Sequence, residues 1–203
     1  MRHLKRGRYL GRSPSHRAAM LRNLASSLIL TERDTTEDDE GKPKVKGRIV
    51  TTLEKAKEVR SLVEKCITIA RKSLAAEEEA SQYATAAQRP SEKWRAWRTS
   101  DDWRRWNQAI APAVAARRRA LRLLGDKQAV RVLFDVLADR FADRDGGYTR
   151  VVRLPAPRLG DAGTRAILEF VGTRDRARRT RQKPSRPRFE DTPADRDTER
   201  GDE

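Results

Sequence analysis

The N-terminal 31 residues carry seven basic side chains and two histidines but no acidic residue. The cations are Arg2, Lys5, Arg6, Arg8, Arg12, Arg17 and Arg22. Side chains of one sign repel one another in water and are stabilised by a polyanion, whose condensed counterions they release on binding. No hydrophobic period is visible before Arg12, so residues 1–12 are not expected to contribute to a core. We therefore expect a basic arm that is disordered in the free protein and ordered on RNA.

The composition extends this basic character to the whole chain. Lys and Arg number 46 against 30 Asp and Glu, which gives a formal net charge of +16 and an isoelectric point of about 10.8. Such a balance favours nucleic acid or an anionic membrane surface as the partner. No apolar run approaches the roughly 18 residues of a membrane span, and no secretory signal is recognisable. An Arg- and Ser-rich N-terminus without acids also fits an organelle transit peptide.

Motifs for catalysis or metal binding are absent from the sequence. It contains no Walker phosphate loop, CxxC pair or HExxH, which argues against an RNA-modifying enzyme. His3 and His16 lack a cysteine cluster, which favours polar contact with RNA or solvent over metal ligation. Cys66 is the single cysteine, so an intramolecular disulfide is excluded and a reducing compartment is indicated. Its place on an apolar helix face favours a core thiol over a nucleophile. Since no cofactor-binding motif is visible either, we expect no cofactor.

Helices and short strands are expected to position the basic residues. Hydrophobic periodicity and capping residues predict helices over about 14–30 and 52–73. A third helix is expected to end near Gly125, and a fourth to begin after Asp126 as its cap and to end at Gly146-Gly147. β-Branched and aromatic runs predict strands over 48–51, 148–154 and 165–171. The glycine pair before Tyr148 is expected to form a turn, because glycine adopts positive φ without steric cost. The turn either aims Tyr148 and Arg150 toward RNA or its immediate neighbour, or simply ends the helix.

Residues 75–112 differ from their surroundings and contain all four tryptophans. Aromatic side chains interleaved with arginine suit stacking on unpaired bases or packing on a protein surface. We favour packing, because the spacing places each tryptophan pair on one side of a helix, and because six acids balance six bases over residues 77–109. We expect one or two helices that pack on the outside of the domain and are dispensable for its core function.

The chain is expected to form one domain over residues 1–173 and a charged tail over 174–203. Apolar residues make up 36% of the chain, against about 45–50% in typical domains. Residues 174–188 contain eight bases and one acid, and residues 190–203 contain seven acids and two bases. Such segments bury little apolar surface, so we expect the tail to be disordered when free.

Four blocks of this sequence resemble bacterial large-subunit ribosomal protein seventeen. They are MRHLKRGRYLGRSPSHRAAMLRNLASSL at the N-terminus, TTLEKAKEVRSLVEKCITIAR at 51–71, ADRFADRDGGYTRVVRL at 138–154 and RLGDAGTRAILEFV at 158–171. The resemblance covers most of 1–32, 48–74 and 114–172, whereas the loop at 33–47, the insertion and the tail have no counterpart. Because it starts at Met1, we expect the arm to belong to the mature protein.

The resemblance implies a structural, non-catalytic component of the large ribosomal subunit in the bacterial cytoplasm. It would bind ribosomal RNA near the exit of the nascent-chain tunnel and contact neighbouring large-subunit proteins. It would not bind a membrane or a small-molecule substrate, and it would not form a homo-oligomer. It also implies an α+β fold, a small two-layer α/β sandwich with helices over a short mixed three-stranded sheet. The net charge alone also allows an alternative function, that of another basic nucleic-acid-binding protein such as a nucleoid protein or a ribosome-assembly factor.

Matching positions imply a set of RNA contacts, to which the charge of the arm adds Arg6. The implied contacts are Arg2, His3, Lys5, Arg8, Arg12, Ser15, His16, Arg17, Arg22, Asn23, Thr51, Lys55, Lys57, Tyr148, Thr149, Arg150 and Arg158. Arginine forks bind phosphate in a bidentate manner and would fix RNA segments relative to one another.

Overall fold

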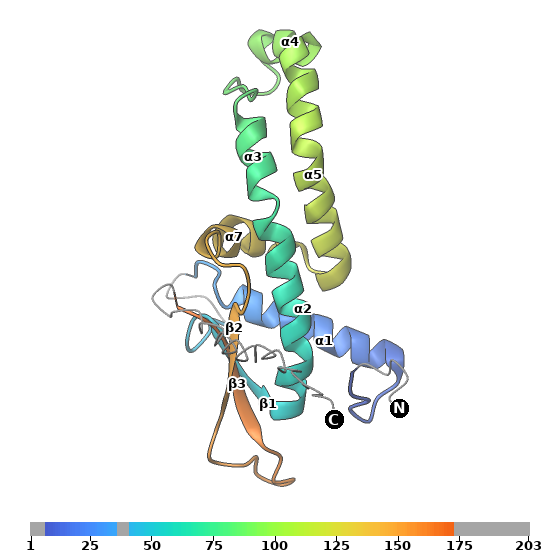
Figure 1. The fold of residues 1–203 in the computed structure, drawn as a ribbon, viewed down its shortest axis with the longest axis vertical. Helices are drawn as coiled ribbons and strands as arrows, with labels where there is room; N and C mark the ends of the chain where they lie inside the picture. Colours follow the sequence, from blue (N-terminus) through green and yellow to red (C-terminus); the bar gives the residue numbers. More distant parts are fainter. Residues whose placement is uncertain (1–6, 36–40, 173–203) are drawn as a thin grey trace, which may run out of the picture.

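The computed structural model describes residues 7–35 and 41–172. The predicted tail and the first half of the arm therefore lie outside the described residues. Figure 1 shows a body of helices and a small sheet, from which a long helical hairpin projects along the longest axis. The α+β class expected from the sequence is confirmed.

The body and the hairpin together contain seven α-helices within the residues that the structure describes. The helices are α1 (Pro14–Leu30), α2 (Leu53–Arg71), α3 (Leu74–Ser81), α4 (Glu92–Thr99), α5 (Asp101–Leu124), α6 (Lys127–Val132) and α7 (Ala138–Arg140), with a π-helical turn at Leu133–Leu137. Gly125 ends α5 with φ of 77°, and the Asp126 carboxylate accepts hydrogen bonds from the Gln128 and Ala129 amides at the start of α6. These boundaries confirm the predicted helix at 14–30 and the predicted stop and cap at 125–126. The prediction that Gly146-Gly147 ends the following helix was wrong, because α7 already ends at Arg140.

The sheet contains β1 (Arg48–Thr52), β2 (Thr149–Arg153) and β3 (Arg165–Phe170) in the order β1-β3-β2. Both neighbouring pairs are antiparallel, with Val50 and Val152 each opposite Ile167. The expectation of a mixed sheet was therefore wrong. β1 and β2 run in the same direction, but β3 lies between them, so no two parallel strands are neighbours.

The core lies between the sheet and α2, with α1, α6 and α7 around it. The α2 stripe predicted from periodicity is fully buried; it consists of Ala56, Val59, Val63, Cys66 and Ala70. From β3, Ala166, Leu168 and Phe170 alternate inward to meet the helices. Ser26 on α1 is buried and donates a hydrogen bond to the Leu124 carbonyl at 3.4 Å.

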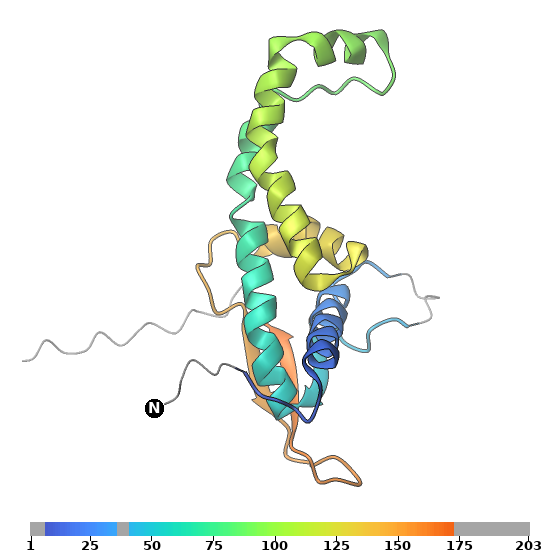
Figure 2. The same ribbon diagram turned by 90° about the vertical axis from the view of Figure 1, so that its right-hand side faces the viewer.

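The insertion projects from the body as a helical hairpin, whereas one or two helices packed on the outside of the domain were expected. Its α3 packs along α5, while the second half of α5 continues into the body (Figure 2). Ser73, just before the insertion, and Pro112, its last residue, line one cavity of about 290 Å³ between α2 and α5. The two ends of the insertion therefore lie close together, and loop closure costs little. That the insertion is dispensable stays a prediction.

Candidate nucleic-acid interface

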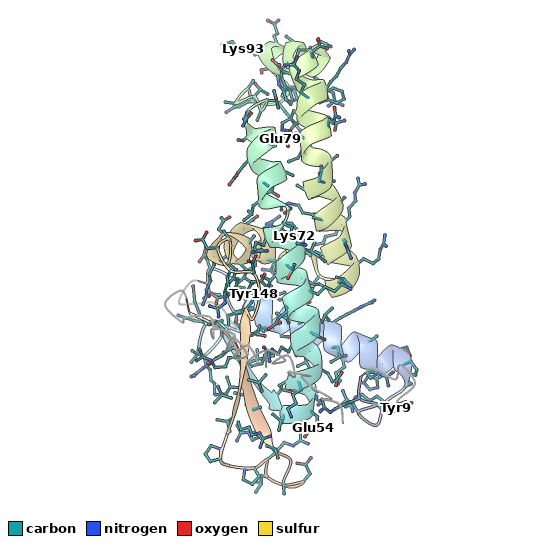
Figure 3. All side chains as sticks on the ribbon, viewed as in Figure 1. Tyr9, Glu54, Lys72, Glu79, Lys93 and Tyr148 are labelled. Atoms are coloured by element: carbon teal, nitrogen blue, oxygen red, sulfur yellow. The ribbon has the colours of Figure 1, made fainter. Side chains whose placement is uncertain are left out.

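One end of the molecule brings together four parts of the chain that contain predicted RNA contacts. They are residues 7–12, the start of α1, the start of α2 and the β2–β3 loop, and Figure 3 labels Tyr9 and Glu54 at this end. We call residues 7–17, 53–58 and 155–164 the basal surface. It contains eight of the predicted contacts: Arg8, Arg12, Ser15, His16, Arg17, Lys55, Lys57 and Arg158.

A tight turn leads from the arm into α1. Leu10 and Gly11 both have positive φ, 54° and 60°, and the Arg12 amide donates to the Tyr9 carbonyl at 3.2 Å. A non-glycine residue with positive φ is uncommon, so the turn depends on surrounding contacts. The Arg12 side chain donates to the Leu10 carbonyl at 3.3 Å and is half-buried beneath the turn.

Two contacts hold this turn against the helices. The Arg8 guanidinium donates to the Glu58 carboxylate on α2 at 3.0 Å. The Arg17 guanidinium lies 5.6 Å from the centre of the Tyr9 ring and donates to the Tyr9 carbonyl at 3.4 Å. Residues 7–12 are therefore placed by the domain, contrary to the expectation of an arm that is free through Arg12. Periodicity missed this, because Arg8 and Glu58 are neighbours only in the tertiary structure.

Beside its two ion-paired arginines, the basal surface contains four cations without an ion pair among the described residues. Arg12, Arg17, Lys55 and Lys57 form no ion pair within the described part of the chain. The first turn of α1 contains no acidic residue, and Ser13 makes no side-chain cap. Backbone N–H groups at such a helix start can accept an anion. This arrangement can bind the phosphates of a nucleic acid.

Arg158 lies at the same end but is held by its own loop. Its Nε donates to Asp161 Oδ1 at 2.8 Å, and its Nη2 donates to Oδ2 of the same carboxylate. The hydrogen bond from Arg158, with a further one from the Gly163 amide, holds the pKa of Asp161 well below its ordinary value. Arg158 therefore orders the β2–β3 loop, and only its remaining N–H groups can reach a phosphate.

Tyr148 and Thr149 are core residues, so the interpretation that aims Tyr148 outward was wrong. Gly147 does turn the chain, with φ of 66°, but the turn directs Tyr148 inward, where 1% of it is exposed and its ring lies 5.1 Å from that of Phe141. Thr149 is 3% exposed and donates to Glu64 at 3.0 Å. Arg150 is exposed and faces Glu169 across the sheet at 3.6 Å.

The remaining predicted contacts lie apart from the basal surface. Arg22 and Asn23 are exposed farther along α1, and Thr51 is half-buried on β1. Four more lie outside the described residues: Arg2, His3, Lys5 and Arg6.

The described residues show no arrangement for metal or thiol chemistry. No group of three potential metal ligands occurs among residues 7–35 and 41–172. Cys66 is fully buried, and burial raises the pKa of its thiol to about 11. Within the same residues, no helix is both long and apolar enough to cross a membrane.

The native Cys66 thiol is expected to resist alkylation by iodoacetamide at about pH 8, whereas the denatured chain reacts at its one thiol. The pKa of the thiol in the folded state lies above its ordinary value of 9.0, so unfolding releases a proton at alkaline pH. The contribution of this group to stability is therefore present below pH 9 and is lost as the pH rises toward 11. Mass spectrometry of the two labelled samples measures the difference; equal labelling rates would place the thiol at the surface.

Fold and surface together define a small α+β protein with a cationic end. Residues 20–171 match the family model of ribosomal protein L17. The chain is 59% identical over 185 residues to the large ribosomal subunit protein bL17 of Rhodopirellula baltica, which covers 91% of this chain and 88% of that protein. It is 35% identical over 171 residues to bL17 of Thermus thermophilus, covering 84% of this chain and 99% of that protein. The chain belongs to the ribosomal protein L17 family, which confirms the resemblance. The expectation that the insertion has no counterpart is wrong for the Rhodopirellula baltica protein, because that match leaves only 18 of the 203 residues uncovered.

Proposed function

We propose that the basal surface and the arm bind large-subunit ribosomal RNA near the exit of the nascent-chain tunnel and stabilise its fold. As a member of this family, the chain is a structural constituent of the large subunit of the cytoplasmic bacterial ribosome and is not an enzyme. Our proposal adds that it acts as a single copy, contacts neighbouring ribosomal proteins and takes no small-molecule substrate. The family match leaves no reason to prefer the nucleoid or assembly-factor alternative.

The gathering of unneutralised cations at one end of the molecule carries this proposal. Arg17 approaches from α1, and Lys55 and Lys57 from α2, at the same end as the turn at residues 7–12. Arginine binds phosphate with a planar fork and lysine as a point charge. The packing of α1 on α2 fixes the spacing of these cations, so the bound RNA segments are held in a defined register.

The double variant Lys55→Gln and Lys57→Gln is expected to weaken retention of the protein on large subunits during sedimentation in high salt. Each phosphate contact that is lost lowers the log–log salt slope of RNA binding by roughly 0.7–0.9. Lys127→Gln with Arg131→Gln removes two exposed cations from α6 and serves as the matched control. An equal loss in both variants would contradict the assignment to the basal surface and would indicate a general effect of net charge.

A further inference from the structure

The far end of the helical hairpin is a second concentration of arginine and aromatic side chains. We call residues 82–108 the tip; they comprise the loop after α3, all of α4 and the start of α5. Figure 2 shows α4 lying across the end of the hairpin, away from the body. Figure 3 places Lys93 at the opposite end of the molecule from Tyr9 and Glu54. The tip and the basal surface therefore face different surroundings.

One tryptophan pair forms the interior of the tip. The rings of Trp97 and Trp106 meet edge to face, with their centres 5.6 Å apart. The Trp97 indole N–H donates to the Tyr83 carbonyl at 3.1 Å, and the Ser91 hydroxyl caps α4 by accepting from the Trp94 amide at 3.2 Å. These contacts join α4, α5 and the preceding loop, so the tip is folded on itself.

The rings of Trp94 and Trp103 contact arginine side chains at the surface. The Arg98 guanidinium lies 5.2 Å from the centre of the Trp94 ring and 5.7 Å from that of Trp103, and Arg89 lies 5.3 Å from Trp94. A guanidinium stacked on an aromatic face keeps its edge N–H groups available to an acceptor. Stacking also restricts the side chain before binding, so less conformational entropy is lost when a phosphate is bound.

The tip is cationic, although the insertion as a whole is balanced. Residues 82–108 contain six bases and three acids, a net charge of +3. Arg104 forms an ion pair with Asp101 at 3.3 Å. The other five cations are exposed and form no ion pair within the described part of the chain: Arg89, Lys93, Arg95, Arg98 and Arg105. The balancing acids Glu77, Glu78 and Glu79 lie on α3, where Glu77 pairs with Arg117 at 3.3 Å.

The apolar surface of the tip is too limited to favour a protein partner. Its four tryptophans are half-buried by one another and by arginine. The large apolar side chains that are most exposed in the described residues all lie elsewhere: Tyr9, Val45, Val50, Val114, Val136, Val152 and Leu159. A protein interface has an apolar centre depleted of charge, whereas exposed arginine beside aromatic rings is typical of contact with single-stranded nucleic acid.

We propose that the tip is a second RNA-binding site, which holds the phosphate backbone of an unpaired RNA segment through Arg89, Arg95, Arg98 and Arg105. This inference rests on the proposed function, since the second segment belongs to the RNA of the same subunit. The basal surface then binds one RNA segment and the tip binds another, so the protein connects two RNA segments that are separated by the length of the hairpin. The insertion thereby extends the reach of the protein without altering the surface by which the body binds.

Tryptophan emission reports on this site alone, because all four tryptophans of the chain lie between residues 94 and 106. The full chain is titrated with an end-labelled oligouridylate of about 20 nucleotides, longer than a typical site of roughly 4–16. Label anisotropy reports binding anywhere on the protein, and tryptophan emission reports binding at the tip. We expect RNA to change both, and to change the emission also in a chain that lacks residues 1–12.

A variant with Arg89, Arg95, Arg98 and Arg105 replaced by Gln is expected to lose the emission change and to keep the anisotropy change. Its log–log salt slope should fall by roughly 0.7 per lost contact with single-stranded RNA. The matched control replaces the same four residues with Lys, which keeps the charge and most of the slope but removes the stacked forks. Emission spectra without RNA show whether each variant retains the folded tip; the titrations of the unmodified and arm-deleted chains do not depend on that result.

Three outcomes would decide against the inference, in distinguishable ways. If RNA changes the anisotropy but leaves tryptophan emission of the unmodified chain unaltered, the tip does not bind RNA and the proposed function stands. If RNA changes neither signal, the proposed function fails as well. In isolated large subunits, ultraviolet cross-linking should attach nucleotides to peptides from residues 82–108. Adducts confined to the basal surface, with Lys93 cross-linked to a protein, would assign the tip to a protein partner instead.

Discussion

Replacing Tyr148 with alanine is expected to lower the free energy of unfolding by about 3–5 kcal/mol, the usual cost of removing a buried aromatic ring. The ring is almost completely buried and contacts Phe141, so its removal leaves a cavity at the junction of α7 and β2. Tyr148→Phe is expected to change the free energy of unfolding little, because the buried hydroxyl has no hydrogen-bond partner in the described structure. Denaturant unfolding followed by circular dichroism measures both variants.

Arg150→Ala is the matched surface control for this experiment. Arg150 lies two residues from Tyr148, on the exposed face of the sheet, and exposed substitutions usually change stability by less than about 0.5 kcal/mol. If Tyr148→Ala instead left the unfolding curve unchanged and weakened RNA binding, the side chain would have to face RNA in the functional state. The assignment of Tyr148 to the core would then be wrong.

Deletion of residues 1–12 is expected to lower the log–log salt slope of binding to large-subunit RNA by roughly 3.5–4.5. Each phosphate contact contributes roughly 0.7–0.9 to that slope, and the deletion removes five cations: Arg2, Lys5, Arg6, Arg8 and Arg12. Dissociation constants measured over a series of salt concentrations give the slope. The thermal midpoint should change little, because the Arg8–Glu58 ion pair is exposed and such pairs contribute about 0–1 kcal/mol.

A full-length chain with the same five cations replaced by Gln separates charge from chain length. Its slope should match that of the deletion if the arm acts through phosphate contacts. A slope equal to that of the unmodified chain in both variants would show that the arm does not contact the RNA backbone. A loss confined to the deletion would assign the effect to the backbone turn at Leu10 and Gly11.

Local sequence signals predicted the secondary structure well, because they act between residues that are neighbours along the chain. Ser13 and Pro14 mark the start of α1, Gly125 and Asp126 mark the boundary between α5 and α6, and the buried stripe of α2 follows its apolar period. Capping and periodicity depend on contacts within one or two helical turns. The same locality explains why the four matching blocks could indicate the family from the order of residues alone.

The sequence by itself determined the basic arm segment, the start of α1, the boundary between α5 and α6, the strand positions and the family. The tertiary structure decided everything that depends on distant segments: β3 lies between β1 and β2, Glu58 holds Arg8, and Tyr148 points inward. It also separated the acids of α3 from the cations of the tip, although a count over residues 77–109 balances them. Charge counts ignore position, whereas electrostatic attraction falls with distance and is screened within about 10 Å in salt. The electrostatic character of each end of this protein is therefore set by which residues the fold brings together.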